Sequence, residues 1–144
     1  MNVSARNVFK GKITQLSNGA VNAEVELTTE GDDKLVAIVT EASVKSLGLA
    51  VGGDVIAYVK APWVIVITGV ADVRFSARNQ LTGKVINLKE GAVNSEVGIQ
   101  LLGGTVVYAV ITNEAVAELG LKQGFEATVL IKASHIVLGV PITR

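Results

Sequence analysis

Cysteine is absent from this chain, and histidine, proline and aromatic residues are all scarce. Without cysteine, neither a disulfide framework nor a thiolate metal site can form. An excess of either charge is missing as well, because 13 basic residues are balanced by 13 acidic ones. The chain therefore lacks the global positive field with which most nucleic-acid-binding proteins attract a polyanion. Any anion that this protein binds must be held by a few charged or polar groups at its binding site.

Long hydrophobic runs are missing too. Residues 1–12 contain no continuous apolar stretch, so neither a signal peptide nor a membrane anchor is expected there. The longest apolar run, near residues 63–71, is interrupted well short of the length needed to cross a bilayer. We therefore expect a cytoplasmic protein with no membrane partner. Apolar residues still make up 49% of the 144 positions, enough for a buried core in one ordinary domain or two very small ones.

The clearest positive feature of the chain is an internal repeat. The tetrapeptide Ser4-Ala5-Arg6-Asn7 recurs 72 positions later as Ser76-Ala77-Arg78-Asn79. The same displacement aligns Gly11-Lys12 with Gly83-Lys84, Gly19-Ala20-Val21-Asn22 with Gly91-Ala92-Val93-Asn94, Leu47-Gly48-Leu49 with Leu119-Gly120-Leu121, and Lys60-Ala61 with Lys132-Ala133. One unbroken register indicates a tandem duplication. We predict a first domain over residues 1–70 and a second over 71–144, held close together because the join has no flexible Pro-, Ser- or Gly-rich stretch.

Each copy is predicted to form mostly β-strands. In the first copy the Val-, Ile- and Thr-rich or alternating segments are residues 7–16, 20–29, 34–39, 55–59 and 63–68. A short helix is expected after the third strand, with Thr40 as its N-cap and Gly48 as its left-handed stop, and Thr112 and Gly120 would serve the second copy. This order is typical of the oligonucleotide-binding (OB) fold. The predicted fold class is all-β, with two OB-type five-stranded barrels that each carry one short helix.

Catalysis has little support in the sequence. The only histidine, His135, sits in an apolar run, which favours a packed or edge residue over a catalytic base. Ser4 and Ser76 have no histidine at an equivalent position that could activate both of them. Among the acids only Glu24 and Glu96 recur identically, so a paired-carboxylate mechanism or a cage for a bare metal cation has little to build on. We therefore expect a binding protein and not an enzyme.

Cationic residues next to small residues do recur. They are Arg6 and Arg78 in the Ser-Ala-Arg-Asn motifs, and Lys60 and Lys132, which Ala61 and Ala133 follow. Arginine offers a planar fork of donors and lysine a compact charge, and together they suit a doubly charged tetrahedral oxyanion. Small neighbours and serine hydroxyls would let the ion reach main-chain N–H groups, and Thr40 or Thr112 at a helix start could add a hydroxyl.

Simpler explanations exist for each of these motifs. Ser-Ala-Arg-Asn fits a solvated turn with an exposed arginine equally well, and a lysine that ends a strand is usually an edge charge. A plain helix cap is the favoured explanation of Thr40 and Thr112. The Gly-Ala-Val-Asn segments are most simply hairpin turns. Two other functions also stay open: a nucleic-acid-binding barrel, which the charge balance disfavours, and a purely structural oligomerisation module.

The ordered motifs together resemble a known family. Ser-Ala-Arg-Asn, Gly-Lys, Gly-Ala-Val-Asn-x-Glu-Val, Leu-Gly-Leu and the closing Lys-Ala are similar to the molybdenum-pterin-binding, or Mop, domain, and two copies that fill the chain resemble the tandem-Mop molbindins. The resemblance implies molybdate or tungstate as the bound ligand, storage or homeostasis as the role, no cofactor, no nucleic-acid partner, and a homotrimer with its sites between barrels.

The resemblance also implies the site residues. One class of oxyanion site would use Ser4, Ala5, Arg6, Asn7, Thr40, Lys60 and Ala61, together with Ser76, Ala77, Arg78, Asn79, Thr112, Lys132 and Ala133. A second class would draw on the turns, at Ala20, Val21, Asn22, Ala92, Val93 and Asn94. The copies differ after the closing Lys-Ala, where Pro62-Trp63 stands against Ser134-His135. Ser134 could add a hydroxyl donor that Pro62 lacks, so the two halves are expected to differ in affinity.

Overall fold

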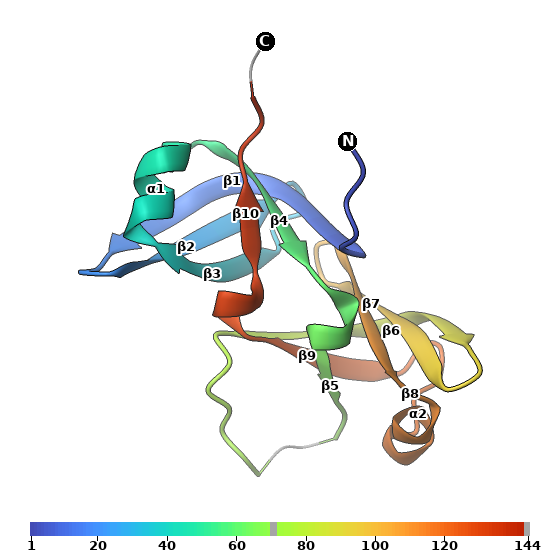
Figure 1. Ribbon diagram of the computed structural model, residues 1–144. Helices are drawn as coiled ribbons and strands as arrows, with labels where there is room; N and C mark the ends of the chain where they lie inside the picture. Colours follow the sequence, from blue (N-terminus) through green and yellow to red (C-terminus); the bar gives the residue numbers. More distant parts are fainter. Residues whose placement is uncertain (70–71, 143–144) are drawn as a thin grey trace.

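The computed structural model describes residues 1–69 and 72–142 and has two curled five-stranded sheets (Figure 1). The first repeat contributes β1 (Asn7–Asn18), β2 (Asn22–Thr29), β3 (Lys34–Thr40), α1 (Glu41–Leu47), β4 (Asp54–Val59), the 3₁₀ turn η1 (Ala61–Trp63) and β5 (Ile65–Ile67). The second contributes β6 (Asn79–Glu90), β7 (Asn94–Leu101), β8 (Val106–Thr112), α2 (Asn113–Leu119), β9 (Glu126–Ile131), the 3₁₀ turn η2 (Ala133–His135) and β10 (Val137–Gly139). The predicted all-β class with two OB-like barrels is confirmed.

The long first strand of each repeat is the central strand of its sheet. β1 pairs with β4 along its first half and with β2 along its second half. The register shifts between Ile13 and Gln15, and a bulge of this kind bends a strand and increases its twist. Gly11 allows close packing at this bend, because a Cβ atom there would lie 2.5 Å from the carbonyl oxygen of Thr28. β6 has an equivalent bulge, where its register with β7 shifts between Val85 and Asn87.

The last strand of each repeat is exchanged. In the first sheet the strand order is β10-β4-β1-β2-β3, and in the second it is β5-β9-β6-β7-β8. Figure 1 shows β10 beside β4 and β5 beside β9. In these pairs Val137 is opposite Tyr58, and Ile65 is opposite Leu130. Boundaries at residues 1–70 and 71–144 stay a prediction about the repeats. Neither range contains all the strands of one sheet.

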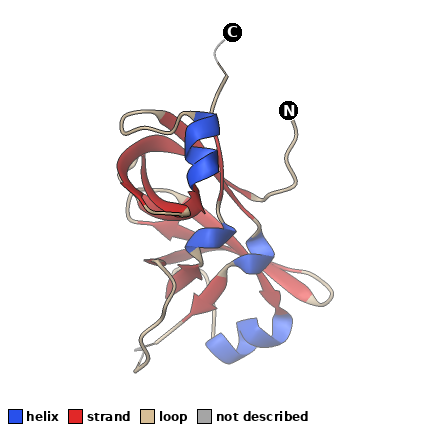
Figure 2. Ribbon diagram, turned by 60° about the vertical axis from the view of Figure 1, so that its left-hand side comes forward, coloured by secondary structure: helices blue, strands red, loops and turns tan. Residues whose placement is uncertain are grey.

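Both predicted helices are present with their predicted caps. The Oγ1 atom of Thr40 accepts the N–H of Ser43 at 3.1 Å, and the helix ends at Gly48 in the left-handed conformation, with φ 65°. Figure 2 shows α1 and α2 at opposite ends of the molecule, with the two 3₁₀ turns close together between them. Neither helix in the described part of the chain has the length or hydrophobicity to cross a membrane.

The predicted strand at residues 63–68 is too long. Only Ile65–Ile67 pair as a strand, while Ala61–Trp63 form the turn η1. The N–H of Val64 bonds back to the carbonyl oxygen of Ala61 at 3.2 Å, so the chain is closed into a turn just before the ladder begins. The second copy forms the same turn without a proline, so Pro62 alone does not cause it.

The two sheets dock tightly where their hairpin loops meet. A Cβ atom at Gly31 would lie 1.9 Å from the carbonyl oxygen of Gly103, and one at Gly103 would lie 2.0 Å from that of Gly31. The carboxylate of Asp33 accepts the N–H groups of Gly103 at 2.8 Å and Thr105 at 3.1 Å. A single buried apolar cluster includes side chains of both sheets. The halves therefore pack directly against each other through one shared core.

Candidate functional site

The first Ser-Ala-Arg-Asn motif and the first closing lysine meet at one end of a sheet. Asn7 opens β1 and lies opposite Val59, so residues 4–6 and Lys60 leave the sheet next to each other. Ser4, Ala5 and Lys60 line one hollow of about 740 Å³. In the second copy Asn79 lies opposite Ile131, so residues 76–78 and Lys132 also leave their sheet next to each other. The structure thus brings Lys60 next to Ser4 and Ala5, from which it is far apart in the sequence.

Two aromatic rings from equivalent positions of the repeats meet in the same hollow. The ring centroids of Trp63 and His135 are 4.8 Å apart, and the rings are tilted by 42°. The Nδ1 atom of His135 is buried and has no hydrogen-bond partner among the described residues. His135 is therefore a packing residue of the junction between the halves, in line with the sequence prediction.

The turns η1 and η2 supply main-chain donors beside the lysines. The first N–H groups of a helical turn have no partner within the turn. The N–H of Ala61 and the N–H of Ala133 occupy this position, although both side chains are buried. Ser134 adds a second such N–H in η2, whereas Pro62 has none to offer. The second half therefore has one more main-chain donor.

The guanidinium groups of the repeated motifs are paired with glutamates of the opposite repeat. Arg6 donates from Nε and Nη2 to the two carboxylate oxygens of Glu96, at 3.2 Å each, and Arg78 donates to Glu24. These bonds raise the pKa of Arg6 above its usual value, so it stays a cation. The pair leaves Nη1 of Arg6 uncommitted to Glu96. Glu24 and Glu96 were not predicted as partners of the arginines, although their identical recurrence in the two repeats was a signal.

The asparagines of the motifs hold the two halves together. Asn7 is buried; its side chain accepts the main-chain N–H of Tyr108 at 2.7 Å and donates to the carbonyl oxygen of Tyr108 at 2.8 Å. Asn79 makes the matching pair of bonds with Val36, at 2.7 and 2.8 Å. β3 and β8 are the edge strands at which these bonds form. The side-chain amides of both asparagines are therefore occupied within the chain.

Thr40 and Thr112 do not line the hollow that contains Ser4 and Lys60. Each lies at the end of its third strand, where Thr40 is opposite Asn22 and Thr112 is opposite Asn94. Their hydroxyls cap α1 and α2, which agrees with the explanation favoured from the sequence. Within one chain these threonines and the closing lysines are separate.

The cap at Thr112 gives a first testable prediction. Thr112→Ala should lower the free energy of unfolding by about 1 kcal/mol, because the N–H of Ala115 loses the acceptor that it now meets at 3.0 Å. Chemical denaturation followed by circular dichroism measures the change. Thr112→Ser keeps the hydroxyl and should stay within about 0.5 kcal/mol of the unaltered protein. Equal destabilisation by both substitutions would contradict the capping role.

The two Gly-Ala-Val-Asn turns are not equivalent. In the first, a carboxylate oxygen of Glu41 accepts the N–H of Gly19 at 3.0 Å. In the second, the N–H of Gly91 bonds to the carbonyl oxygen of Asn94 at 2.9 Å, and the amide of Asn113 donates to the carbonyl oxygen of Gly91. Residues 20–22 and 92–94 lie at these turns, and none of them lines the hollow that contains Lys60. A carboxylate thus already occupies one N–H of the first turn.

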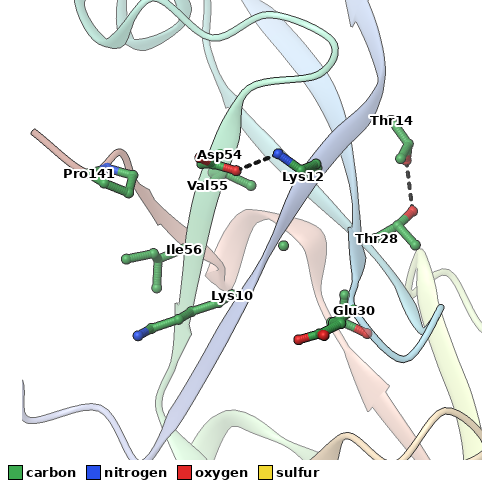
Figure 3. Close-up of a pocket in the computed structure, with 11 residues that line it drawn as sticks. Lys10, Lys12, Thr14, Thr28, Glu30, Asp54, Val55, Ile56 and Pro141 are labelled. Carbon is green, nitrogen blue, oxygen red and sulfur yellow. Dashed lines mark hydrogen bonds and ion pairs between the residues drawn. The ribbon is translucent and has the colours of Figure 1, made fainter. Parts of the chain in front are cut away.

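A neighbouring hollow of about 720 Å³ lies on the outer face of the first sheet (Figure 3). Its charged groups include Lys12 and Asp54, which are joined at 2.9 Å, and its hydroxyls include Thr14 and Thr28, also 2.9 Å apart. None of the predicted oxyanion-site residues lines it. In residues 1–69 and 72–142, no three acidic or histidine side chains gather to hold a metal ion.

The chain is similar to known proteins over nearly its whole length. The model of the TOBE domain family matches residues 3–66 and again residues 76–138. The molybdenum-pterin-binding protein MopA of Rhodobacter capsulatus is 42% identical over 141 residues, which are 98% of this chain and 53% of MopA. The molybdenum transport protein ModE of Azotobacter vinelandii is 39% identical over 97% of this chain and 52% of its own length. The chain thus spans about half the length of these two relatives.

A solved structure matches the chain from end to end. It is the cytoplasmic molybdate-binding protein ModG with molybdate bound, and it superposes with a TM-score of 0.92 at 55% sequence identity. The match covers 98% of this chain and 100% of that one. The arrangement of both sheets is therefore shared with a protein that holds an oxyanion.

Proposed function

Because the chain belongs to the TOBE domain family, as a tandem Mop-type molbindin, we propose that it binds molybdate or tungstate reversibly in the cytoplasm, for storage or homeostasis. The observation that carries the proposal is the convergence of Ser4, Ala5 and Lys60 on one hollow. Ser4 supplies a hydroxyl, Ala5 is small enough to let an ion reach the main-chain N–H groups, and Lys60 supplies a positive charge. A tetrahedral dianion needs groups of these kinds. No covalent change of the oxyanion is involved.

The lysines supply most of the charge in this proposal. The ion pairs of the described residues engage Arg6, Arg78 and Lys12, whereas neither Lys60 nor Lys132 takes part in one. An unpaired ammonium group can give its full charge to a ligand, while an arginine beside a glutamate contributes chiefly through its remaining N–H groups. Charge-assisted hydrogen bonds contribute roughly 1.5 to 3 kcal/mol each, so a few of them suffice for useful affinity.

Assembly into a homotrimer would complete the sites. One chain leaves the hollow open and leaves Val3, Trp63 and Val137 exposed around it. Exposed apolar patches of this kind mark interaction surfaces. In the proposed trimer a neighbouring chain covers them, and it supplies Thr40 or Thr112 to the lysine and Ser-Ala-Arg-Asn groups of the first chain. The turns at residues 20–22 and 92–94 are the proposed second class of site.

Isothermal titration with molybdate, tungstate and sulfate tests the proposed function. We expect heat with molybdate and tungstate, and weaker binding by about tenfold in Arg6→Ala/Arg78→Ala, because the oxyanion loses N–H donors in both halves. Arg74→Ala, outside the repeated motifs, is the matched control and should bind like the unaltered protein. Unchanged affinity in the double variant would refute the arginine assignment. No heat with any of the three oxyanions would favour the structural oligomerisation module instead.

A further inference from the structure

We propose that the two halves bind oxyanions unequally, and that the half with Arg6 and Lys60 binds more tightly than the half with Arg78 and Lys132. The inference deepens the proposed oxyanion-binding function and rests on it. Its basis is that the side chains around the two arginines, which come from the opposite repeat, differ in net charge. The repeated Ser-Ala-Arg-Asn and Lys-Ala motifs themselves carry the same charges in both halves.

Acidic side chains surround Arg78. It lines a small hollow of about 140 Å³ with Glu24, Glu26 and Ser17. Glu24 pairs with the guanidinium, and Glu26 is held nearby by the hydroxyl of Thr14, which donates to its carboxylate at 2.9 Å. Glu24 and Glu26 are two positions apart on β2 and therefore share one face of the sheet. One arginine and two glutamates leave a net negative charge around Arg78.

The equivalent surroundings of Arg6 are positive. Gly98 replaces the second glutamate, and the ring of Tyr108 fills its place, with the guanidinium carbon of Arg6 3.6 Å from the ring centroid. A Cβ atom at position 98 would lie 3.2 Å from the Cε1 atom of Tyr108, so the ring favours glycine there. Lys89, which replaces Ser17, lies directly opposite Glu96 in the β6–β7 pair. Two cations and one glutamate leave a net positive charge.

A dianion responds strongly to this difference. Its energy in the field of a nearby charge is twice that of a monovalent ion, although solvent and salt screen groups that are this exposed. We therefore expect the affinities of the two halves to differ by about five- to tenfold at low ionic strength. The difference should shrink as salt is added. The extra main-chain donor at Ser134 acts in the opposite direction, so the experiment must change charge alone.

Single-lysine variants of the intact protein separate the halves. Lys132→Ala keeps the Arg6 half, and Lys60→Ala keeps the Arg78 half, so molybdate titrations of the two variants compare the half-sites directly. Lys132→Ala should bind about five- to tenfold more tightly than Lys60→Ala at low salt. Adding Glu26→Gln to Lys60→Ala should tighten binding about threefold, because the amide keeps the bond from Thr14 but removes the charge. Adding Lys89→Gln to Lys132→Ala should weaken binding to a similar extent.

Glu118→Gln is the matched control. It removes the same charge from an exposed position on α2. It should leave the molybdate affinity of both single-lysine variants unchanged. Equal affinities of the two single-lysine variants, or equal effects of Glu26→Gln and Glu118→Gln, would overturn the inference while the proposed function stands. Absence of heat when molybdate is added to the unaltered protein would overturn both.

Discussion

Lys60→Ala/Lys132→Ala should lose oxyanion binding almost completely, by about a hundredfold or about 2.7 kcal/mol. The charges of Arg6 and Arg78 are offset by glutamates at hydrogen-bond distance, whereas neither lysine belongs to an ion pair of the described residues. Lys60 also lines the hollow that Ser4 and Ala5 share. Removal of both ammonium groups would leave neutral donors and paired cations to hold a dianion, so the loss should exceed that in the arginine double variant.

Molybdate titration measures this loss, and Lys10→Ala is the matched control. Lys10 lies on β1 of the first sheet, and it lines the neighbouring hollow in which no predicted oxyanion residue lies (Figure 3). Its removal should leave the affinity unchanged. Both lysine variants should unfold at the same denaturant concentration as the unaltered protein, because the removed ammonium groups take part in no ion pair with residues 1–69 or 72–142. If the double variant binds normally, the positive charge of the site must come from the arginines.

Asn7→Ala/Asn79→Ala should destabilise the fold by about 4 kcal/mol. Asn7 is 1% exposed and Asn79 is 3% exposed, and each bonds both the N–H and the carbonyl oxygen of one residue on the edge strand of the other sheet. Truncation leaves these main-chain groups without partners in a buried position, which costs about 1 to 3 kcal/mol for each group. The effect should be large because four such bonds disappear at once.

Urea denaturation followed by circular dichroism measures the destabilisation. Asn87→Ala is the control, since Asn87 is an exposed asparagine on β6, and it should change the free energy of unfolding by less than about 0.5 kcal/mol. A double variant with an unchanged midpoint and slope would mean that water replaces the lost bonds. In that case the junction between the sheets would depend mainly on the close contact of Gly31 with Gly103 and on Asp33.

Local features of this protein could be predicted from its sequence. Alternation of apolar and polar residues places the long strands, and Thr40 with Gly48 defines the ends of α1. These features depend on neighbours a few residues apart, so a linear pattern contains them. The tandem repeat likewise identifies Ser4, Ala5 and Lys60 as one constellation, which the pairing of β1 with β4 brings together.

Contacts between the halves were decided only in three dimensions. Arg6 and Asn7 are both predicted oxyanion ligands, and in the fold the guanidinium of Arg6 also pairs with Glu96 while the side-chain amide of Asn7 bonds to Tyr108. Every residue type except proline has the same main-chain N–H and carbonyl groups. The sequence therefore could not show which residue on an edge strand bonds to Asn7. Glu96 was visible as a recurring acid without a partner.

The sequence by itself determined the elements of this protein, their order and their duplication, because each depends on nearby residues. Only the tertiary structure decided which sheet receives each last strand. β5 and β10 come from equivalent positions of two similar repeats, and either could pair with β4 or with β9. A linear pattern cannot distinguish such alternatives. In the exchanged arrangement the turn η1 packs against β8 and η2 against β3, and Trp63 and His135 meet between the halves.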